Sequence, residues 1–225
     1  IPLAPRNIRN TLQAKNFFDC NCHFTTTEWQ REQYPEGMRG FISVLRKCVD
    51  TEFFAPAPAS RFSFGDCELT ERQEIVTLSV RDAARLREGG FWCELPSLLS
   101  ARPDCHVVLI STGKEVRLDS LRESMAAFPS GMRGRIHLLD FLPPGAYRDL
   151  LCVSSLHLCK DISFMLPSEL LEAMSCGCVV LAPDTGAVRE VLSDGQNGFL
   201  YPPGRRMNWV MLITLSVSYT HLPLP

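Results

Sequence analysis

Residues able to bind an anion and a pair of hydroxyls come together in the short stretch 167–177. Pro167 suits the first position of a helix, where its missing N–H costs nothing, and Ser168 and Glu169 follow it. The backbone amides of these two residues would lack partners within the helix and would point at an anion. Glu172 comes one turn later. The amides and this carboxylate together could hold a phosphate and a ribose diol, with Glu169 contributing mainly its amide.

A second place of the same kind begins at Thr185. Thr185-Gly186 opens another expected helix and again offers free amides. A plainer interpretation of both places is a pair of ordinary helices whose carboxylates and hydroxyls are solvated. Helix physics alone leaves these two interpretations open.

The elements that would carry these residues alternate between apolar strands and helices. Continuous apolar runs are typical of parallel strands that are covered on both faces. The expected strands are residues 75–80, 106–110, 136–139, 156–159, 178–182 and 198–201. We therefore predict an α/β fold with a Rossmann-like, doubly wound parallel sheet. Such sheets bind ligands at the carboxyl ends of their strands, so one mouth should be shared by the loops that open at Arg81, Ser111, Phe141, Lys160 and Pro183.

The bulk composition is that of an ordinary globular chain. It has 225 residues, of which 45% are hydrophobic, and a formal net charge of −2. A near-neutral chain without clustered Lys and Arg is a poor binder of nucleic-acid backbones. The most apolar stretch, residues 209–217, is well short of the ~20 residues that span a bilayer.

The ten cysteines are expected to be reduced, mostly buried thiols. The chain is too large for a disulfide-stapled mini-fold and starts without an apolar signal segment. Its close cysteine pairs, Cys20/Cys22 and Cys176/Cys178, have C-x-C spacing rather than the C-x-x-C spacing of zinc sites. Reduced thiols predict a cytoplasmic protein, and no cluster in the sequence predicts a metal site.

Three consecutive motifs mark residues 170–204. They read Leu-Leu-Glu-Ala-Met-Ser-Cys-Gly, then Asp-Thr-Gly-Ala-Val-Arg-Glu-Val, then Asp-Gly-Gln-Asn-Gly-Phe-Leu-Tyr-Pro-Pro-Gly. In order and spacing they resemble the motifs of the group-1 retaining glycosyltransferases, of family 4 type, which have the GT-B fold. A triple match of this kind is far more specific than a lone glycine pattern. Weaker similarity reaches back to about residue 15, with Lys47-Cys48 in place of the family's usual Asn-Gly.

The resemblance implies that the ligand is a nucleoside-diphosphate sugar. In such enzymes the carboxy-terminal domain holds this donor, and Glu172 stands where the motif's second glutamate binds the ribose. A basic pair after the first strand stabilises the leaving diphosphate, and we assign this catalytic role to Arg81 and Arg87, whose plainer interpretation is solvated arginines. The implied donor-binding residues are Ser168, Glu169, Glu172, Thr185 and Gly186. We expect no cofactor besides the co-substrate and no metal, and one cleft lined by Arg81, Ser168, Glu172 and Thr185.

Two departures from the family concern the donor. The family often has a first glutamate eight residues before the second, and here that position is Phe164. A subgroup of the family also has Phe there, so the difference bears on the identity of the sugar more than on activity. The loop 81–92 lacks the family's usual glycine and lysine.

We expect three parts along the chain. Residues 1–40 would be a remnant of the N-terminal acceptor domain and the interdomain passage, and residues 41–204 the nucleotide-sugar-binding domain. Residues 205–225 lose the amphipathic pattern, and their last ten residues resemble the translation of a sequencing-library adapter. We therefore expect this tail to be non-native or disordered, and the chain to be a fragment that is inactive alone.

The function predicted in this way is glycosyl transfer. A retaining enzyme would move a sugar from a nucleoside-diphosphate donor to a glycan, or to a lipid or protein hydroxyl, with no nucleic-acid partner and no transmembrane segment. It could still rest on a membrane surface. Two alternatives stay open: a nucleotide-sugar-binding module without turnover, and a GT-B sugar-nucleotide epimerase, against which the Leu-Leu-Glu-Ala-Met run argues.

Overall fold

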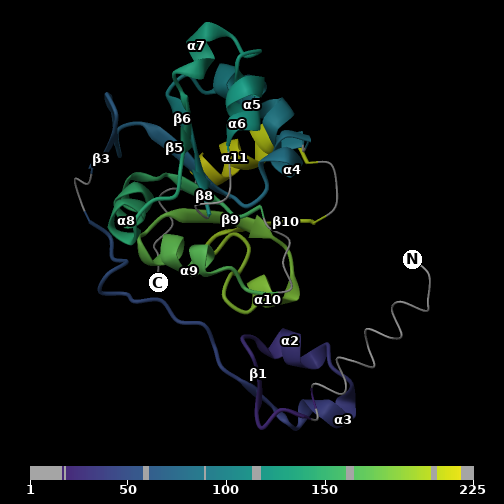
Figure 1. Cartoon of the computed structure of the whole chain (residues 1–225). Helices are drawn as coiled ribbons and strands as arrows, with labels where there is room; N and C mark the ends of the chain where they lie inside the picture. Colours follow the sequence, from purple (N-terminus) through teal and green to yellow (C-terminus); the bar gives the residue numbers. More distant parts are fainter. Residues whose placement is uncertain are drawn as a thin grey trace.

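A six-stranded parallel sheet forms the centre of the computed structural model (Figure 1). The structure describes residues 17, 19–57, 61–88, 90–112, 118–160, 165–203 and 207–218. The strand order is β10-β9-β8-β5-β6-β7, and every neighbouring pair is parallel. The strands are β5 Glu74–Val80, β6 Cys105–Ser111, β7 Ile136–Leu139, β8 Leu156–Leu158, β9 Val179–Pro183 and β10 Phe199–Tyr201. The predicted fold class is confirmed.

The sheet is wound in both directions from β5. The chain first adds β6 and β7 on one side and then returns to add β8, β9 and β10 on the other. The order therefore reverses between β5 and β8. In doubly wound sheets this is the place where the carboxyl ends leave a crevice for a ligand.

Helices cover both faces, because alternate side chains of a strand point to opposite sides. Val76 and Leu78 pack with helices α4, α5, α6 and α11, whereas Ile75 packs on the opposite face with α8. Helices α9 and α10 lie on this second face, over β9. The helices of the domain are α4 Ala83–Glu88, α5 Gly90–Ala101, α6 Asp119–Met125, α7 Ser130–Arg133, α8 Pro144–Val153, α9 Ser168–Ser175, α10 Gly186–Arg189 and α11 Trp209–Ser218.

A β-hairpin that the sequence analysis does not predict precedes the sheet. Strands β3 (Arg61–Phe64) and β4 (Cys67–Thr70) are antiparallel, and Phe64 pairs with Cys67 across a two-residue turn. Gly65 opens this turn with a φ of 52°, a left-handed conformation that glycine adopts without strain. Phe62 and Leu69 bury the hairpin against α8.

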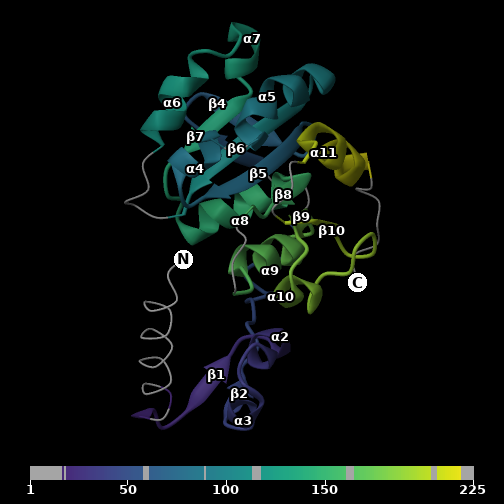
Figure 2. The ribbon, with the colours of Figure 1, turned by 90° about the vertical axis from the view of Figure 1, so that its right-hand side faces the viewer.

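A small lobe lies below the main domain and next to α10, as both ribbon views show (Figures 1 and 2). It contains β1 His23–Thr25, α2 Glu28–Glu32, α3 Glu36–Arg39 and β2 Ile42–Val44. Strands β1 and β2 pair in parallel with each other and with no strand of the main sheet. The sheet of the lobe thus continues past residue 40, where we expected the domain boundary, and the division into domains stays a prediction.

The expectation of an unpacked tail is wrong for residues 207–218. Helix α11 packs on α5, where the Trp209 ring meets Phe91 edge-on with centroids 5.7 Å apart. Ile213 is fully buried, and the Trp209 amide donates to the Glu94 carboxylate at 2.7 Å. The helix is apolar almost all round, so it shows no amphipathic period although it is packed. Within the described ranges, no helix is both long and apolar enough to cross a bilayer.

Candidate functional site

The carboxyl ends of β5, β8 and β9 meet at one edge of the sheet. Leu78 of β5 pairs in register with Leu158 of β8, which pairs with Leu181 of β9. Arg81 and Asp184 each lie three residues beyond these partners. The two positions are therefore level with each other, two strand spacings or roughly 10 Å apart. The register brings the start of α4 and the start of α10 to the same edge. The start of α9 lies beside them, because the Glu169 carboxylate is close to the Cys159 thiol just after β8.

Helix α9 presents its first turn at this edge. Pro167 is the N-cap residue, and its side chain cannot accept a hydrogen bond from the first-turn amides. Ser168 is exposed, whereas the Glu169 side chain is buried. The helix extends over Ser168–Ser175, within one residue of the prediction. Its amides are thus placed as expected, and the Glu169 carboxylate is directed into the domain.

Glu172 is a half-buried carboxylate with an upward-shifted pKa. Burial is the main cause, and the neighbouring Glu169 carboxylate adds to it. A hydrogen bond from Ser168 and the positive charge of Lys47 act in the opposite direction and favour the charged form. The Glu172 carboxylate is therefore partly shielded from water and lies near the donors Ser168 and Lys47. Such surroundings suit a carboxylate that accepts hydrogen bonds from the hydroxyls of a ligand.

Lys47 reaches this site from the segment that joins the lobe to the domain. Its Nζ atom donates to the Leu166 carbonyl at 2.7 Å, just before α9 begins. In the sequence, Lys47 is notable only as a departure from the family's usual Asn-Gly. Since the contact spans 119 residues of sequence, local pattern could not reveal it.

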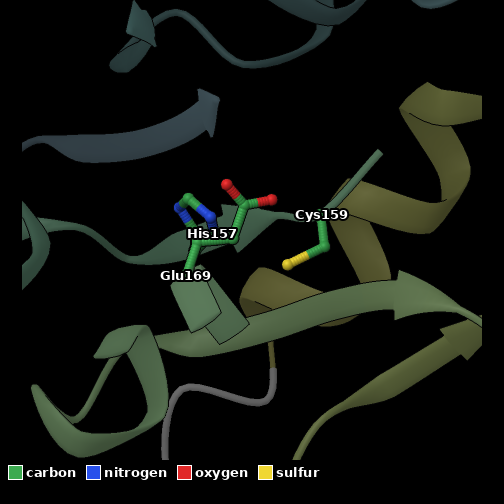
Figure 3. A group of neighbouring side chains, drawn as sticks. All are labelled: His157, Cys159 and Glu169. Carbon is green, nitrogen blue, oxygen red and sulfur yellow. The ribbon is translucent and has the colours of Figure 1, made fainter. Parts of the chain in front are cut away.

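A polar cluster that the sequence analysis did not find lies beneath the start of α9 (Figure 3). His157, Cys159 and Glu169 are all buried, and their nitrogen, sulfur and carboxylate ligand atoms lie within 4.8 Å of one another. The His157 Nδ1 atom is 2.9 Å from the Thr77 hydroxyl, and its Nε2 atom has no hydrogen-bond partner among the described residues. Burial lowers the pKa of His157, which favours a neutral ring beside the Glu169 carboxylate. The sequence carries one indication of this cluster: residues 157 and 159 are two apart, so in a strand their side chains lie on the same face.

The second predicted helix start has a structural role as well. Helix α10 spans only Gly186–Arg189, and the Thr185 hydroxyl caps it by accepting from the Val188 amide at 3.3 Å. A Cβ added at Gly186 would lie 2.0 Å from Trp29 Cδ1. The glycine is therefore required by the close approach of an indole ring from the small lobe. Binding of a donor by Thr185 and Gly186 stays a prediction.

The two arginines are both exposed, Arg81 directly after β5 and Arg87 on α4. Ala83 and Leu86 are the buried positions of α4, so Arg87 belongs to its outer side. Arg81 directly follows β5, so the strand register supports its place at the carboxyl edge of the sheet. The register gives less direct support for Arg87, which lies further along on α4. Phe164 falls outside the described residues.

The family model of the glycosyl transferases group 1 matches residues 91–214. The chain belongs to this family. The Mycobacterium tuberculosis alpha-maltose-1-phosphate synthase is 27% identical over 169 residues, which are 74% of this chain and 43% of that protein. The phosphatidyl-myo-inositol mannosyltransferase of Mycolicibacterium smegmatis is 30% identical over 154 residues, 68% of this chain and 37% of that protein. This chain thus spans less than half the length of these relatives.

Solved structures support the GT-B assignment of the fold. Anabaena HepE in complex with UDP-glucose superposes with a TM-score of 0.65 at 16% identity, covering 89% of this chain and 55% of that one. The C-terminal domain of the group 1 protein LpcC from Francisella tularensis gives 0.58 at 20% identity, covering 76% of this chain and 88% of that domain. The described sheet corresponds to the C-terminal half of the fold, as the resemblance implied.

Proposed function

We propose that this chain carries the donor half of a retaining glycosyltransferase, which moves a sugar from a nucleoside diphosphate to a hydroxyl acceptor. The observation that carries the proposal is the first turn of α9, set at the reversal of the strand order with the half-buried Glu172 one turn into the helix. Family membership supports transfer over the two alternatives, a binding module without turnover and an epimerase.

In the proposed site the helix amides bind the negatively charged diphosphate, and Glu172 binds the ribose of the nucleoside. The diphosphate lies against the amides of Ser168 and Glu169, where a helix start favours an anion. The Glu172 carboxylate accepts both hydroxyls of the ribose. Glu169 needs to contribute only its amide, because its carboxylate is buried. Thr185 and Gly186 would add amides from the neighbouring strand end.

Departure of the diphosphate is the step that the domain assists. Negative charge develops on the leaving oxygen as the bond to the sugar breaks, and fixed positive groups at that oxygen lower the barrier. Arg81 and Arg87 are the residues proposed for this role. The acceptor hydroxyl, from a glycan, a lipid or a protein, would approach from the side of the small lobe, and no nucleic acid takes part.

We propose that the reaction needs no metal ion or other cofactor. The helix amides and two arginines already offset the charge of the diphosphate. Magnesium, the usual partner of phosphates, takes oxygen ligands, whereas the cluster beneath α9 offers nitrogen, sulfur and one carboxylate. Dialysis against EDTA is expected to leave donor binding unchanged. A loss restored by a divalent ion would contradict this part of the proposal.

The ten free cysteines support a cytoplasmic location. The expectation that they are mostly buried is wrong, because four are buried (Cys105, Cys159, Cys176 and Cys178) and four are exposed (Cys20, Cys22, Cys48 and Cys93). Burial raises the pKa values of the Cys105, Cys176 and Cys178 thiols. Such thiols behave as small apolar side chains. A chain that uses its cysteines in this way suits a reducing compartment.

Calorimetric titration with UDP-, GDP- and ADP-sugars tests the proposed function. We expect one-to-one binding of at least one of the three, with the matching free nucleoside diphosphate competing for the same site. Binding of the diphosphate but not of the nucleoside would support the role of the helix amides. If the folded chain binds none of the three nucleotides, the donor site is refuted.

A further inference from the structure

The motif residue Glu190 contacts the small lobe. Its two carboxylate oxygens accept hydrogen bonds from the Glu28 amide at 3.1 Å and the Trp29 amide at 2.6 Å. Its Oε2 atom also lies 3.2 Å from a guanidinium nitrogen of Arg46. One side chain of the main domain thus contacts the lobe at the start of α2 and at the segment that leaves it.

The two amides are those that α2 cannot satisfy by itself. A helix start leaves its first amides without partners. Within the lobe, Thr27 accepts from the Gln30 amide at 3.2 Å, and the Gln30 side chain accepts in return from Thr27 at 3.1 Å. This capping box satisfies the amides of Thr27 and Gln30 but not those of Glu28 and Trp29. The Glu190 carboxylate supplies their partners from outside the lobe.

Close packing at Gly186 supports the same contact independently. Gly186 begins α10 and Glu190 caps its end, so the two residues are four apart and lie on the same face. A methyl group at Gly186 would lie 2.0 Å from Trp29 Cδ1. Trp29 packs with the core beneath α9 and α10. The face of α10 that carries Glu190 is therefore shaped to accept the indole ring.

We infer that Glu190, Gly186 and Trp29 form an interlobe latch that sets the orientation of the small lobe over the donor domain. Glu190 is a positioning residue in this role. The Arg46 ion pair contributes little, since Arg46 is 62% exposed and solvent screens it. The amide bonds and the Trp29 packing contribute most.

The latch is tested in the full chain by releasing it from either side. Glu190→Ala removes the acceptor of both amides, while Gly186→Ala keeps the carboxylate and displaces the indole. Their controls are Glu123→Ala, an exposed carboxylate on α6, and Gly131→Ala, where an added Cβ meets nothing within 4 Å. Circular dichroism verifies that each variant is folded, and Glu190→Gln replaces Glu190→Ala if the latter is not.

Two measurements detect undocking of the small lobe without any nucleotide. Trp92 and Trp209 are only 4% and 6% exposed, so increased quenching by acrylamide reports on Trp29. Trypsin cleavage after Arg46 or Lys47 reports on the joining segment, which the latch and the Leu166 contact hold in place. Loss of bonds to a charged acceptor should raise the undocked population roughly tenfold or more.

We expect both latch variants to increase quenching and tryptic cleavage, and both controls to match the wild type. Wild-type quenching and cleavage in folded Glu190 and Gly186 variants would overturn the latch. The assignment of the lobe to the acceptor side rests on the proposed function. Because the latch assay uses no nucleotide, its failure and a failure of donor binding are distinguishable.

Discussion

Glu172→Ala is the substitution that the donor site predicts in most detail. The carboxylate is held half-buried on α9, one turn beyond the amides proposed for the diphosphate. In the proposed site, removing it deletes the acceptor of two ribose hydroxyls. Hydrogen bonds to a charged group contribute about 1.5–3 kcal/mol, so the dissociation constant of the nucleoside diphosphate should rise roughly 10- to 150-fold.

The assay is calorimetric titration of wild type and variant with whichever of UDP, GDP and ADP binds. Glu123→Ala is the control, because it removes an exposed helical carboxylate from α6, on the opposite face of the sheet from α9. Glu169→Ala is a poor control although it lies one turn away, since its carboxylate is buried beside His157 and Cys159. Equal affinity of Glu172→Ala and wild type would refute the ribose role.

Three further predictions follow from the same contacts. Glu172→Gln should raise the melting temperature at neutral pH, because the pKa of Glu172 is higher in the folded state than in the unfolded state and its charged form therefore costs stability. This gain in melting temperature should vanish as the pH falls below the unfolded-state pKa of Glu172. Arg81→Ala should weaken binding of the nucleoside diphosphate but not of the nucleoside, because the arginine is placed against phosphate charge, and equal losses in titrations of the two ligands would contradict that. Trp209→Ala should lower the stability by about 3–5 kcal/mol in denaturant unfolding, since it removes a buried ring packed on Phe91, and an unchanged midpoint would mean that α11 is not packed.

The sheet could be predicted because its signal is local. Uninterrupted apolar runs such as residues 106–110 mark parallel strands covered on both faces, and β6 occupies Cys105–Ser111. The start of α9 was predictable for a similar reason, since Pro167 is compatible with only a few helix positions. Both signals lie within a few residues of the feature that they predict.

The errors arose where tertiary packing, rather than the local hydrophobic pattern of the sequence, determines the structure. The β3–β4 hairpin was not predicted, although Gly65-Asp66 is a favourable two-residue turn. Helix α11 was missed because its apolar residues show no period. Strand β2 pairs with β1, which lies about twenty residues earlier, across the boundary expected after residue 40.

The site was predicted only in part, since its long-range contacts have no local signature. The motif predicts a role for Glu172, and the register brings Arg81 and the start of α10 to one edge. Gly186 and Glu190 belong to the same motif, but their contacts with Trp29 come from the other lobe. A motif read along the chain cannot separate residues that face the ligand from residues that face a neighbouring lobe.

The central claim is that the first turn of α9 receives the diphosphate, and amide chemical shifts measure this most directly. In a ¹H–¹⁵N titration of the labelled chain with the nucleoside diphosphate that binds, the amides of Ser168 and Glu169 should show the largest saturable shifts. The corresponding nucleoside should leave these two amides nearly unmoved. If the largest shifts instead fall away from the carboxyl edge of β5, β8 and β9, the proposed donor site is contradicted.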